Sequence, residues 1–116
     1  MTNCRRGDVV LVYFPNSSLD ATKKRPALVV QADDLGTGLQ QVVVAMISSN
    51  LNRRGHPSRV FITRQSPAGA ATGLLTDSVV MTDNVATVLE GLIERRIGTL
   101  ADMTAVDTSL RHTLAL

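Results

Sequence analysis

Short runs of Val, Leu and Ile, each followed by residues that favour turns, recur along the chain and limit the folds open to it. Three runs are apolar almost throughout, at residues 9–14, 27–31 and 41–47, and a fourth at residues 58–63 alternates polar with apolar side chains. β-branched residues favour extended backbone, and alternation is typical of a strand with one exposed face. The continuous run at residues 27–31 suits a strand buried on both faces. The pattern predicts a sheet of short strands.

The second half of the chain is harder to divide into elements. Residues 67–73 contain Pro and Gly and predict a turn. Residues 77–82 predict a further strand, which residues 85–88 can continue. Residues 89–100 fit either a short helical turn or a last strand around residues 92–97, and both interpretations stay open.

The last segment predicts an amphipathic helix over residues 101–114. Met103, Val106, Leu110 and Leu114 follow one another at spacings of three, four and four residues, which places them on one helix face. No residue before them stands out as a helix cap. Several strands followed by one terminal helix predict a mainly β fold, in which a strongly bent antiparallel sheet or small barrel packs against the helix.

Composition excludes several classes of protein. The 116 residues are 44% hydrophobic, which suits one domain with one core. With no Trp, one Tyr and two Phe, the chain lacks the exposed aromatic rows on which an RRM stacks bases. A lone Cys4 cannot form an internal disulfide, and His56 and His112 lie too far apart for a metal-ligand motif, so no zinc site is expected. The longest apolar stretch, residues 42–47, is far shorter than the about 20 residues that a membrane helix needs, and we expect a soluble cytoplasmic protein.

Charge is distributed unevenly along the chain. Residues 1–64 carry nine Lys and Arg against four Asp and Glu, whereas residues 65–116 carry three against six. A basic half attracts a polyanion such as RNA or DNA, and equally an acidic protein segment. Charge alone does not choose between these partners.

Four short motifs stand in order along the chain. They read RGDVVLV at residues 6–12, RPALVV at 25–30, VVVAMIS at 42–48 and GLLTDSVV at 73–80. In this order and spacing they resemble the MazF/PemK family of toxins from bacterial type II toxin-antitoxin modules. The resemblance covers nearly the whole chain and continues through residues 96–100 into the terminal helix.

The resemblance implies a fold, an activity and partners. It implies an SH3-like barrel that forms a homodimer and cleaves single-stranded RNA at short sequences without a metal or other cofactor. It also implies a cognate antitoxin whose acidic, disordered tail covers the RNA groove. The basic half suits both partners, and the polar segment at residues 15–24, which is longer than most hairpin connections, corresponds to a loop beside the family's active site.

Two residues align with the family's catalytic positions. Cleavage by the RNA's own 2′-hydroxyl needs charge stabilisation on the phosphorane oxygens, a proton acceptor and a proton donor. Arg25 aligns with the catalytic arginine, and its planar guanidinium suits charge stabilisation. Ser48 stands where the family usually has threonine or serine, so its hydroxyl would bond to the scissile phosphate. From the residues alone, a surface arginine beside Pro26 and a serine that caps a turn remain alternatives.

Asp83 and Asn84 correspond to an acidic-then-amide pair in the family. In some members the carboxylate is proposed to act as a general base, and in others the pair reads bases. Here Met81 replaces an arginine that some members use in cleavage, and Ala86 replaces a commonly basic residue. We therefore assign Asp83 and Asn84 to RNA contact, and a simple turn is the alternative.

Further candidates lie among the basic and polar residues near these positions. The candidate RNA contacts are Lys24, Arg53 and Arg59, for each of which a solvated face is the alternative, and Ser49. Histidine is a common acid or base in catalysis, but His56 precedes Pro57 in a predicted loop without a matched second histidine. We expect it to be structural or exposed.

Two other functions remain open from the sequence. A CcdB-like toxin of the same fold would bind DNA gyrase and leave RNA intact, although Arg25 and the Ser48 hydroxyl argue against this. An inactive module that only sequesters antitoxin or nucleic acid is suggested by Met81 and Ala86.

Overall fold

The computed structural model describes residues 4–13 and 24–116. The strands in this part of the chain are β1 (Asp8–Val12), β2 (Arg25–Val29), β3 (Gln41–Ser48), β4 (Arg59–Ile62), β5 (Ser78–Leu89) and β6 (Ile93–Thr99). The helices are α1 (Pro67–Ala71) and α2 (Thr104–Leu114), and two short 3-10 turns are η1 (Leu51–Arg53) and η2 (Glu90–Leu92). The strands form one antiparallel sheet in the order β4-β5-β3-β2-β1-β6.

Most predicted strands are confirmed, and one prediction is wrong. The predicted strand over residues 9–14 is β1 as far as Val12. Residues 14–23, which include all but the last residue of the polar segment predicted at 15–24, lie outside the described residues. Residues 67–73 were predicted as a turn, but they begin with α1. Ser66 caps this helix by accepting a hydrogen bond from the Gly69 backbone N at 2.9 Å, and Pro67 is its first residue.

Residues 89–100, for which a helical turn and a strand were both open, contain both a helical turn and a strand. The chain makes the 3-10 turn η2 and then enters β6, which pairs with β1. The predicted strands at residues 77–82 and 85–88 are one long strand, β5, whose pairing with β3 shifts between Ala45 and Met46. β5 is therefore interrupted by a bulge, and such bulges bend a sheet.

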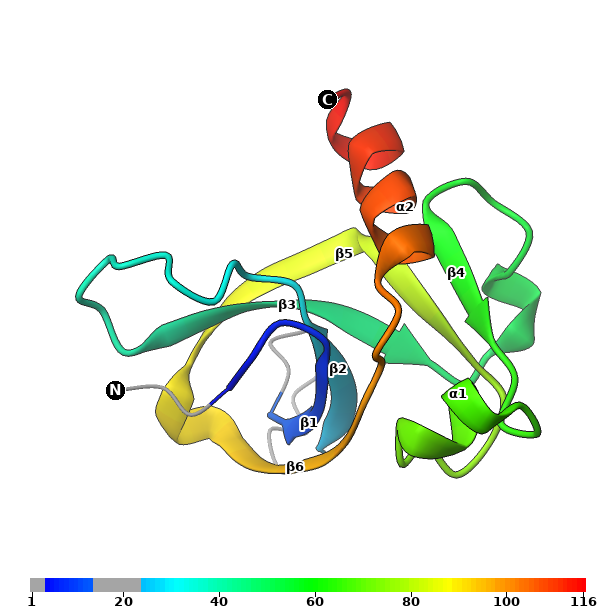
Figure 1. Ribbon diagram of the computed structural model, residues 1–116, viewed down its shortest axis with the longest axis horizontal. Helices are drawn as coiled ribbons and strands as arrows, with labels where there is room; N and C mark the ends of the chain where they lie inside the picture. The colour runs from blue at the N-terminus through cyan, green and yellow to red at the C-terminus, as the bar shows by residue number, and fades with distance from the viewer. Residues whose placement is uncertain (1–3, 14–23) are drawn as a thin grey trace.

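The sheet is strongly bent and leaves β4 and β6 as its two edges. In Figure 1, β1, β2 and β6 curl together with the ends of β3 and β5, and β4, α1 and α2 lie beyond this curl. The first three strands have apolar side chains on both faces. Val10 packs inside the curl, whereas the neighbouring Val9 packs in a second core that includes Val106 of α2. This double burial explains why their sequences are continuous apolar runs. The mainly β fold with a terminal helix is confirmed.

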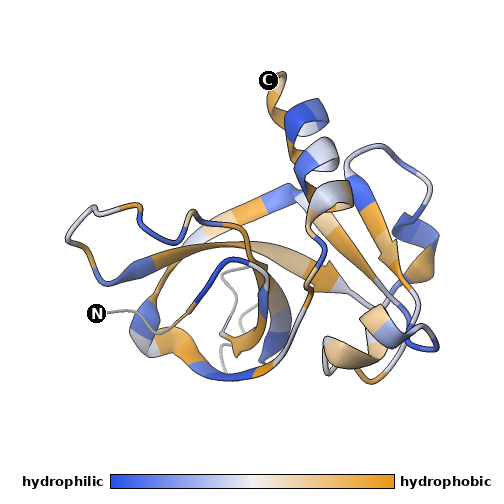
Figure 2. Cartoon of the chain, viewed as in Figure 1, coloured by the Kyte–Doolittle hydropathy of each residue, from blue (hydrophilic) through white to orange (hydrophobic). Residues whose placement is uncertain are grey.

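The helix α2 agrees with the predicted amphipathic pattern except at its end. Val106 is fully buried, while Leu114 is 58% exposed. Figure 2 shows hydrophilic residues on the visible side of α2, in contrast to the largely apolar β3. The Asp102 carboxylate accepts a hydrogen bond from the Thr104 backbone N at 3.0 Å, and hydrogen bonding to Thr104 lowers the pKa of Asp102. Asp102 thus supplies the helix-start acceptor that the sequence pattern did not reveal. In the described part of the chain, no helix has the length and apolarity to cross a membrane.

Candidate functional site

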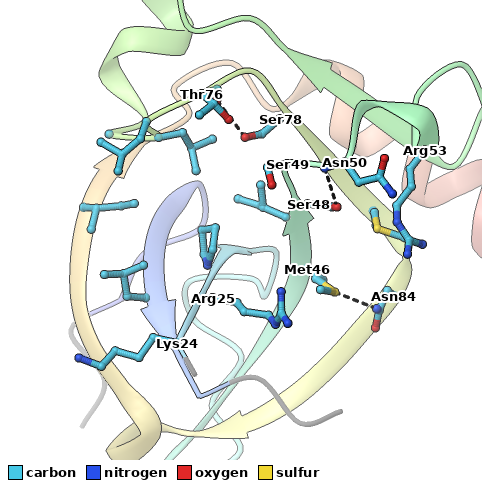
Figure 3. A pocket seen from close by; sticks show the side chains of 18 of the residues that line it. Lys24, Arg25, Met46, Ser48, Ser49, Asn50, Arg53, Thr76, Ser78 and Asn84 are labelled. Atoms are coloured by element: carbon cyan, nitrogen blue, oxygen red, sulfur yellow. Dashed lines mark hydrogen bonds between the residues drawn. The ribbon is translucent and has the colours of Figure 1, made fainter. Parts of the chain in front are cut away.

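A pocket of about 1010 Å³ opens on one face of the sheet, where the start of β2 meets the end of β3 (Figure 3). Residues of β5, β6 and the connection from α1 to β5 complete its wall. Its polar and charged lining side chains are Lys24, Arg25, Ser48, Ser49, Asn50, Arg53, Thr76, Ser78, Asn84 and Arg95. Six of the eight residues proposed from the sequence for catalysis or RNA contact are therefore brought together, and Arg59 and Asp83 are not among them.

The charged side chains in the pocket are all cationic. Lys24, Arg25, Arg53 and Arg95 line it, and no Asp, Glu or His is found among its described lining residues. Within such a concave wall the potentials of like charges add, so the pocket attracts anions. The arrangement can bind a phosphate chain and stabilise negative charge that develops on it.

Arg25 occupies the centre of the charge arrangement. It is the first residue of β2 and pairs with Val12 of β1, so its backbone is fixed by the sheet. Its Nε is buried and has no hydrogen-bond partner among the described residues. A buried donor that is left unsatisfied costs folding free energy. The Arg25 guanidinium therefore keeps unused donor capacity next to the pocket that the residue lines.

Ser48 is the last residue of β3 and faces the same pocket (Figure 3). Its Oγ accepts a hydrogen bond from the Asn50 backbone N at 3.1 Å, and the Asn50 side chain in turn accepts one from the Asn52 backbone N at 3.1 Å. The turn-capping role considered for Ser48 is thus present. This role uses Ser48 Oγ as an acceptor only, because no hydrogen bond donated by the Ser48 hydroxyl is found in the described structure. The hydroxyl proton remains available for a ligand.

Asn84 reaches the pocket from the bulge of β5. Its Nδ2 lies 3.1 Å from the Sδ of Met46, to which it donates (Figure 3). A thioether is a weak acceptor, so a better acceptor on a ligand can replace it. The amide oxygen and nitrogen together offer an acceptor and two donors, which suits contact with the edge of a base.

Arg59 and Asp83 contact each other outside the lining of the pocket. Arg59 Nη2 and Asp83 Oδ2 are 2.8 Å apart, and Arg59 Nη1 also donates to the Arg53 backbone oxygen at 3.2 Å. The pair thus joins β4, η1 and the β5 bulge. RNA contact by Arg59 and Asp83 stays a prediction. In the structure the two side chains pair with each other.

Sequence reasoning missed Arg95, which lines the pocket from β6. Because the side chains of a strand alternate, Arg95 and Ile97 share the pocket face, while Arg96 points the other way, with its Nη1 3.7 Å from the Asp8 carboxylate. This alternation was the available signal. It could not be used while residues 89–100 were open to a helical interpretation.

Lys24 stands at the rim of the pocket and is already paired. Its Nζ lies 2.9 Å from the Glu94 carboxylate, and this hydrogen bond raises the pKa of Lys24. The ammonium is therefore charged at every physiological pH. A phosphate that contacts Lys24 must compete with Glu94 for it.

We expect Glu94→Gln to strengthen RNA binding. The change frees Lys24 for one more phosphate contact, which steepens the dependence of log K on log salt by about 0.7 for single strands. The measurement is binding of an RNA with a 2′-O-methyl group at the cleavage position, over a range of salt concentrations. Glu90→Gln changes the net charge equally without touching Lys24, and it should leave the slope unchanged. Identical slopes for the two variants would contradict the expectation.

The histidines and the cysteine lie outside the lining of the pocket. His56 Nδ1 accepts a hydrogen bond from the Ser58 backbone N at 3.0 Å, and its ring centroid is 6.2 Å from that of His112. The predicted structural role of His56 is thus supported by a backbone contact. Among the described residues, no group of three or more His, Cys, Asp and Glu is placed to hold a metal ion.

Comparison with known proteins agrees with this fold. Residues 5–114 match the family described as the PemK-like, MazF-like toxin of type II toxin-antitoxin systems. Over 105 residues, covering 88% of both chains, the sequence is 34% identical to "Endoribonuclease MazF6" of Mycobacterium tuberculosis and to "Endoribonuclease MazF2" of Mycobacterium bovis.

Solved structures share the fold at lower sequence identity. The Mycobacterium tuberculosis toxin MazF-mt6 superposes with a TM-score of 0.73 at 24% identity, covering 94% of this chain and 97% of that one. An endoribonuclease from a mycobacterial species, in complex with its cognate antitoxin, gives 0.72 at 23% identity, with 97% and 96% covered. A bent sheet with a terminal helix and a cationic pocket defines a small β protein with a site suited to anions. The chain belongs to the PemK-like, MazF-like toxin family of type II toxin-antitoxin systems.

Proposed function

We propose that this chain is an endoribonuclease toxin that cleaves single-stranded RNA, with Arg25 and Ser48 acting at the scissile phosphate. The observation that carries the proposal is the Arg25 Nε, buried without a hydrogen-bond partner among the described residues in a pocket whose charged lining is cationic. A phosphodiester offers two oxygens to such a guanidinium. The relatives named as endoribonucleases support the same activity.

The chemistry uses the RNA's own 2′-oxygen. The 2′-hydroxyl gives up its proton to water, and its oxygen attacks the adjacent phosphorus to form a 2′,3′-cyclic phosphate. The bond from phosphorus to the 5′-oxygen of the next nucleotide breaks, and this oxygen takes a proton from water and leaves as a hydroxyl group. Arg25 stabilises the charge on the nonbridging oxygens, and the Ser48 hydroxyl donates to one of them. The flanking nucleotides are held by Lys24, Ser49, Arg53 and Asn84. Because the described lining contains no carboxylate or imidazole, these side chains supply charge stabilisation rather than proton transfer.

The test is incubation of the purified protein, free of antitoxin, with one structured and one unstructured RNA in EDTA. We expect cleavage at a short recurring sequence that leaves a 2′,3′-cyclic phosphate or its hydrolysis product. The chelator is included because guanidinium groups already supply the positive charge that a divalent ion would bring. RNA that stays intact over a broad set of sequences would overturn the proposal.

Ser48 gives a separate prediction. We expect Ser48→Ala to lower the rate of the cleavage step about 10²-fold, as does removal of one donor to a developing oxyanion. Ser48→Thr keeps both the donor and the acceptor for the Asn50 backbone N, and should retain most of the rate. Single-turnover kinetics at saturating RNA measure the step, and thermal unfolding reports the cost of losing the turn contact. A Ser48→Ala rate equal to that of the unchanged protein would contradict the assignment.

The proposed activity also sets the partners and the place of action. We infer that a cognate antitoxin inhibits the protein by laying an acidic, disordered tail over the cationic pocket, where it competes with RNA. The family implies a homodimer built from a single toxin domain over residues 1–116. Because the substrate is cellular RNA, we infer that the protein acts in the cytoplasm, where it inhibits translation and growth.

The structure offers no observation in favour of the gyrase-binding or sequestering alternatives. Met81, one of the two departures from the family pattern, is 5% exposed and lines the pocket as an apolar residue. Ala86, the other, packs against the core inside the curl. Both departures therefore fall at positions that the fold fills with apolar contacts, and neither removes Arg25 or Ser48.

A further inference from the structure

Four hydroxyl side chains form a cluster between α2 and the β5 bulge, outside the lining of the pocket. They are Ser58, Thr82, Ser109 and Thr113. Ser58, Thr82 and Ser109 are each less than 5% exposed. Buried hydroxyls of this kind are costly unless they are hydrogen-bonded, so their partners define what the cluster holds together.

The cluster joins α2 to β5 and to the start of β4. Thr82 Oγ1 donates to the Ser58 backbone oxygen at 2.7 Å, and it lies 2.8 Å from Ser109 Oγ and 2.9 Å from Thr113 Oγ1. Ser109 Oγ lies 2.8 Å from the Pro57 backbone oxygen. Thr113 Oγ1 lies 2.7 Å from Ser58 Oγ and 2.9 Å from the Ser109 backbone oxygen.

These contacts outnumber the protons available to them. Four hydroxyl groups carry four protons, so at most four of the contacts are hydrogen bonds at one time. The hydroxyl oxygens of Thr82, Ser109 and Thr113 each have more than one hydrogen-bonding neighbour, which fixes Thr82 from several directions. Removal of Ser109 or Thr113 leaves Thr82 with fewer partners inside a site closed to water.

The bulge places the cluster next to the pocket. In the β3–β5 pairing, Ala45 faces Val85 while Met46 faces Met81, so the backbone of residues 82–84 is not paired with β3. Their position must therefore be set by other contacts.

Thr82 supplies the contact on the helix side. Its backbone N donates to the Ser58 backbone oxygen at 2.9 Å, in addition to the contacts of its hydroxyl. The next residue, Asp83, pairs with Arg59, which follows Ser58. The residue after that, Asn84, lines the pocket. A shift of Thr82 is passed on to Asn84 within two residues.

We propose that Ser109 and Thr113 of α2 are positioning residues for base selection: through Thr82 they fix the β5 bulge and hence the amide of Asn84. The inference rests on the proposed RNA cleavage. Hydrogen bonds that select a base lose their discrimination when the donor or the acceptor is displaced by about 1 Å or less. The helix, although outside the pocket, is therefore part of the selectivity of the enzyme.

The experiment compares Ser109→Ala with Val106→Ala. Both residues are buried on α2, but Val106 packs in the apolar core and its side chain has no group that can hydrogen-bond to the cluster. Both changes lower Tm. We expect only Ser109→Ala to reduce the preference for the favoured RNA sequence over its single-base variants, by about tenfold, within the range of one base-edge hydrogen bond. In Ser109→Ala, the rate constant of cleavage at saturating concentrations of the favoured RNA should change less than the KM for that RNA.

Variants of Thr113 test the hydroxyl itself. Thr113→Val keeps the shape and removes the hydroxyl, and should relax the preference as Ser109→Ala does. Thr113→Ser keeps the hydroxyl and should keep the sequence preference of the unchanged protein. Equal sequence preference in Ser109→Ala and Val106→Ala, or in both Thr113 variants, would overturn the proposal.

A readout without RNA separates this proposal from the proposed function. Amide hydrogen exchange at Asp83 and Asn84 should be faster in Ser109→Ala than in Val106→Ala when both are compared at equal stability. If the unchanged protein cleaves no RNA, the proposed function fails while this exchange result still decides whether α2 holds the bulge. Unchanged exchange at these two amides overturns the coupling whatever the activity.

Discussion

Arg25→Ala is expected to lower the single-turnover rate of RNA cleavage about 10³-fold, the scale of losing one preorganised group that stabilises transition-state charge. The same change removes the buried Nε that lacks a partner among the described residues, so it should not lower Tm. Loss of activity without loss of stability would mark Arg25 as a residue retained for chemistry. Arg25→Lys keeps the charge but not the planar fork, and should recover only part of the rate.

A matched control separates charge stabilisation from simple attraction of RNA. Arg53 lines the same pocket from η1 and is exposed. Arg53→Ala should weaken binding and lower the salt slope by somewhat less than about one unit, with little change in the saturated rate. If Arg25→Ala and Arg53→Ala both act only on binding, the catalytic assignment of Arg25 is wrong.

Gly73→Ala is expected to have the largest effect on stability. Gly73 has a φ of +75°, and a Cβ at this position would overlap the backbone carbonyl of Ile97 on β6. The left-handed backbone and the overlap with rigid main chain together cost about 3 kcal/mol or more. Thermal unfolding followed by circular dichroism should show Tm lower by about 10 °C or more. Because Gly73 also lines the pocket, the folded fraction should cleave RNA more slowly.

Gly91→Ala is the control for this change. A Cβ at Gly91 would meet no heavy atom within 4 Å, and its φ lies outside the left-handed region. Its Tm should stay close to that of the unchanged protein. An equally small shift for Gly73→Ala would show that β6 can move away from the connection between α1 and β5 at little cost.

The sequence predicted the parts of the fold that depend on short-range pattern. Strands β1 to β3 were recognised because double burial leaves continuous apolar runs, and α2 because its apolar residues recur at helical spacing. The helix α1 was missed because a segment of five residues with Pro and Gly resembles a turn, and its start depends on the Ser66 cap. The bulge of β5 depends on contacts with α2, which are remote in sequence.

The candidate site was predictable where the family motif fixed it. Arg25 and Ser48 were chosen by alignment, and the structure brings both to one pocket. The separation of Arg59 and Asp83 from that pocket could not be foreseen, because their ion pair forms across two strands 24 residues apart in sequence. Arg95 was missed because its strand had no secure assignment.

The double burial of the first three strands limits where this protein can change in evolution. Most residues of β1, β2 and β3 are buried and the others are only partly exposed, so few positions within these strands could take a new polar group without loss of packing. Arg25 is the first residue of β2 and Ser48 the last of β3. New target sequences must therefore arise from substitutions at strand ends, in connecting loops and at the bulge, while the chemistry stays anchored to a framework that selection for folding keeps constant.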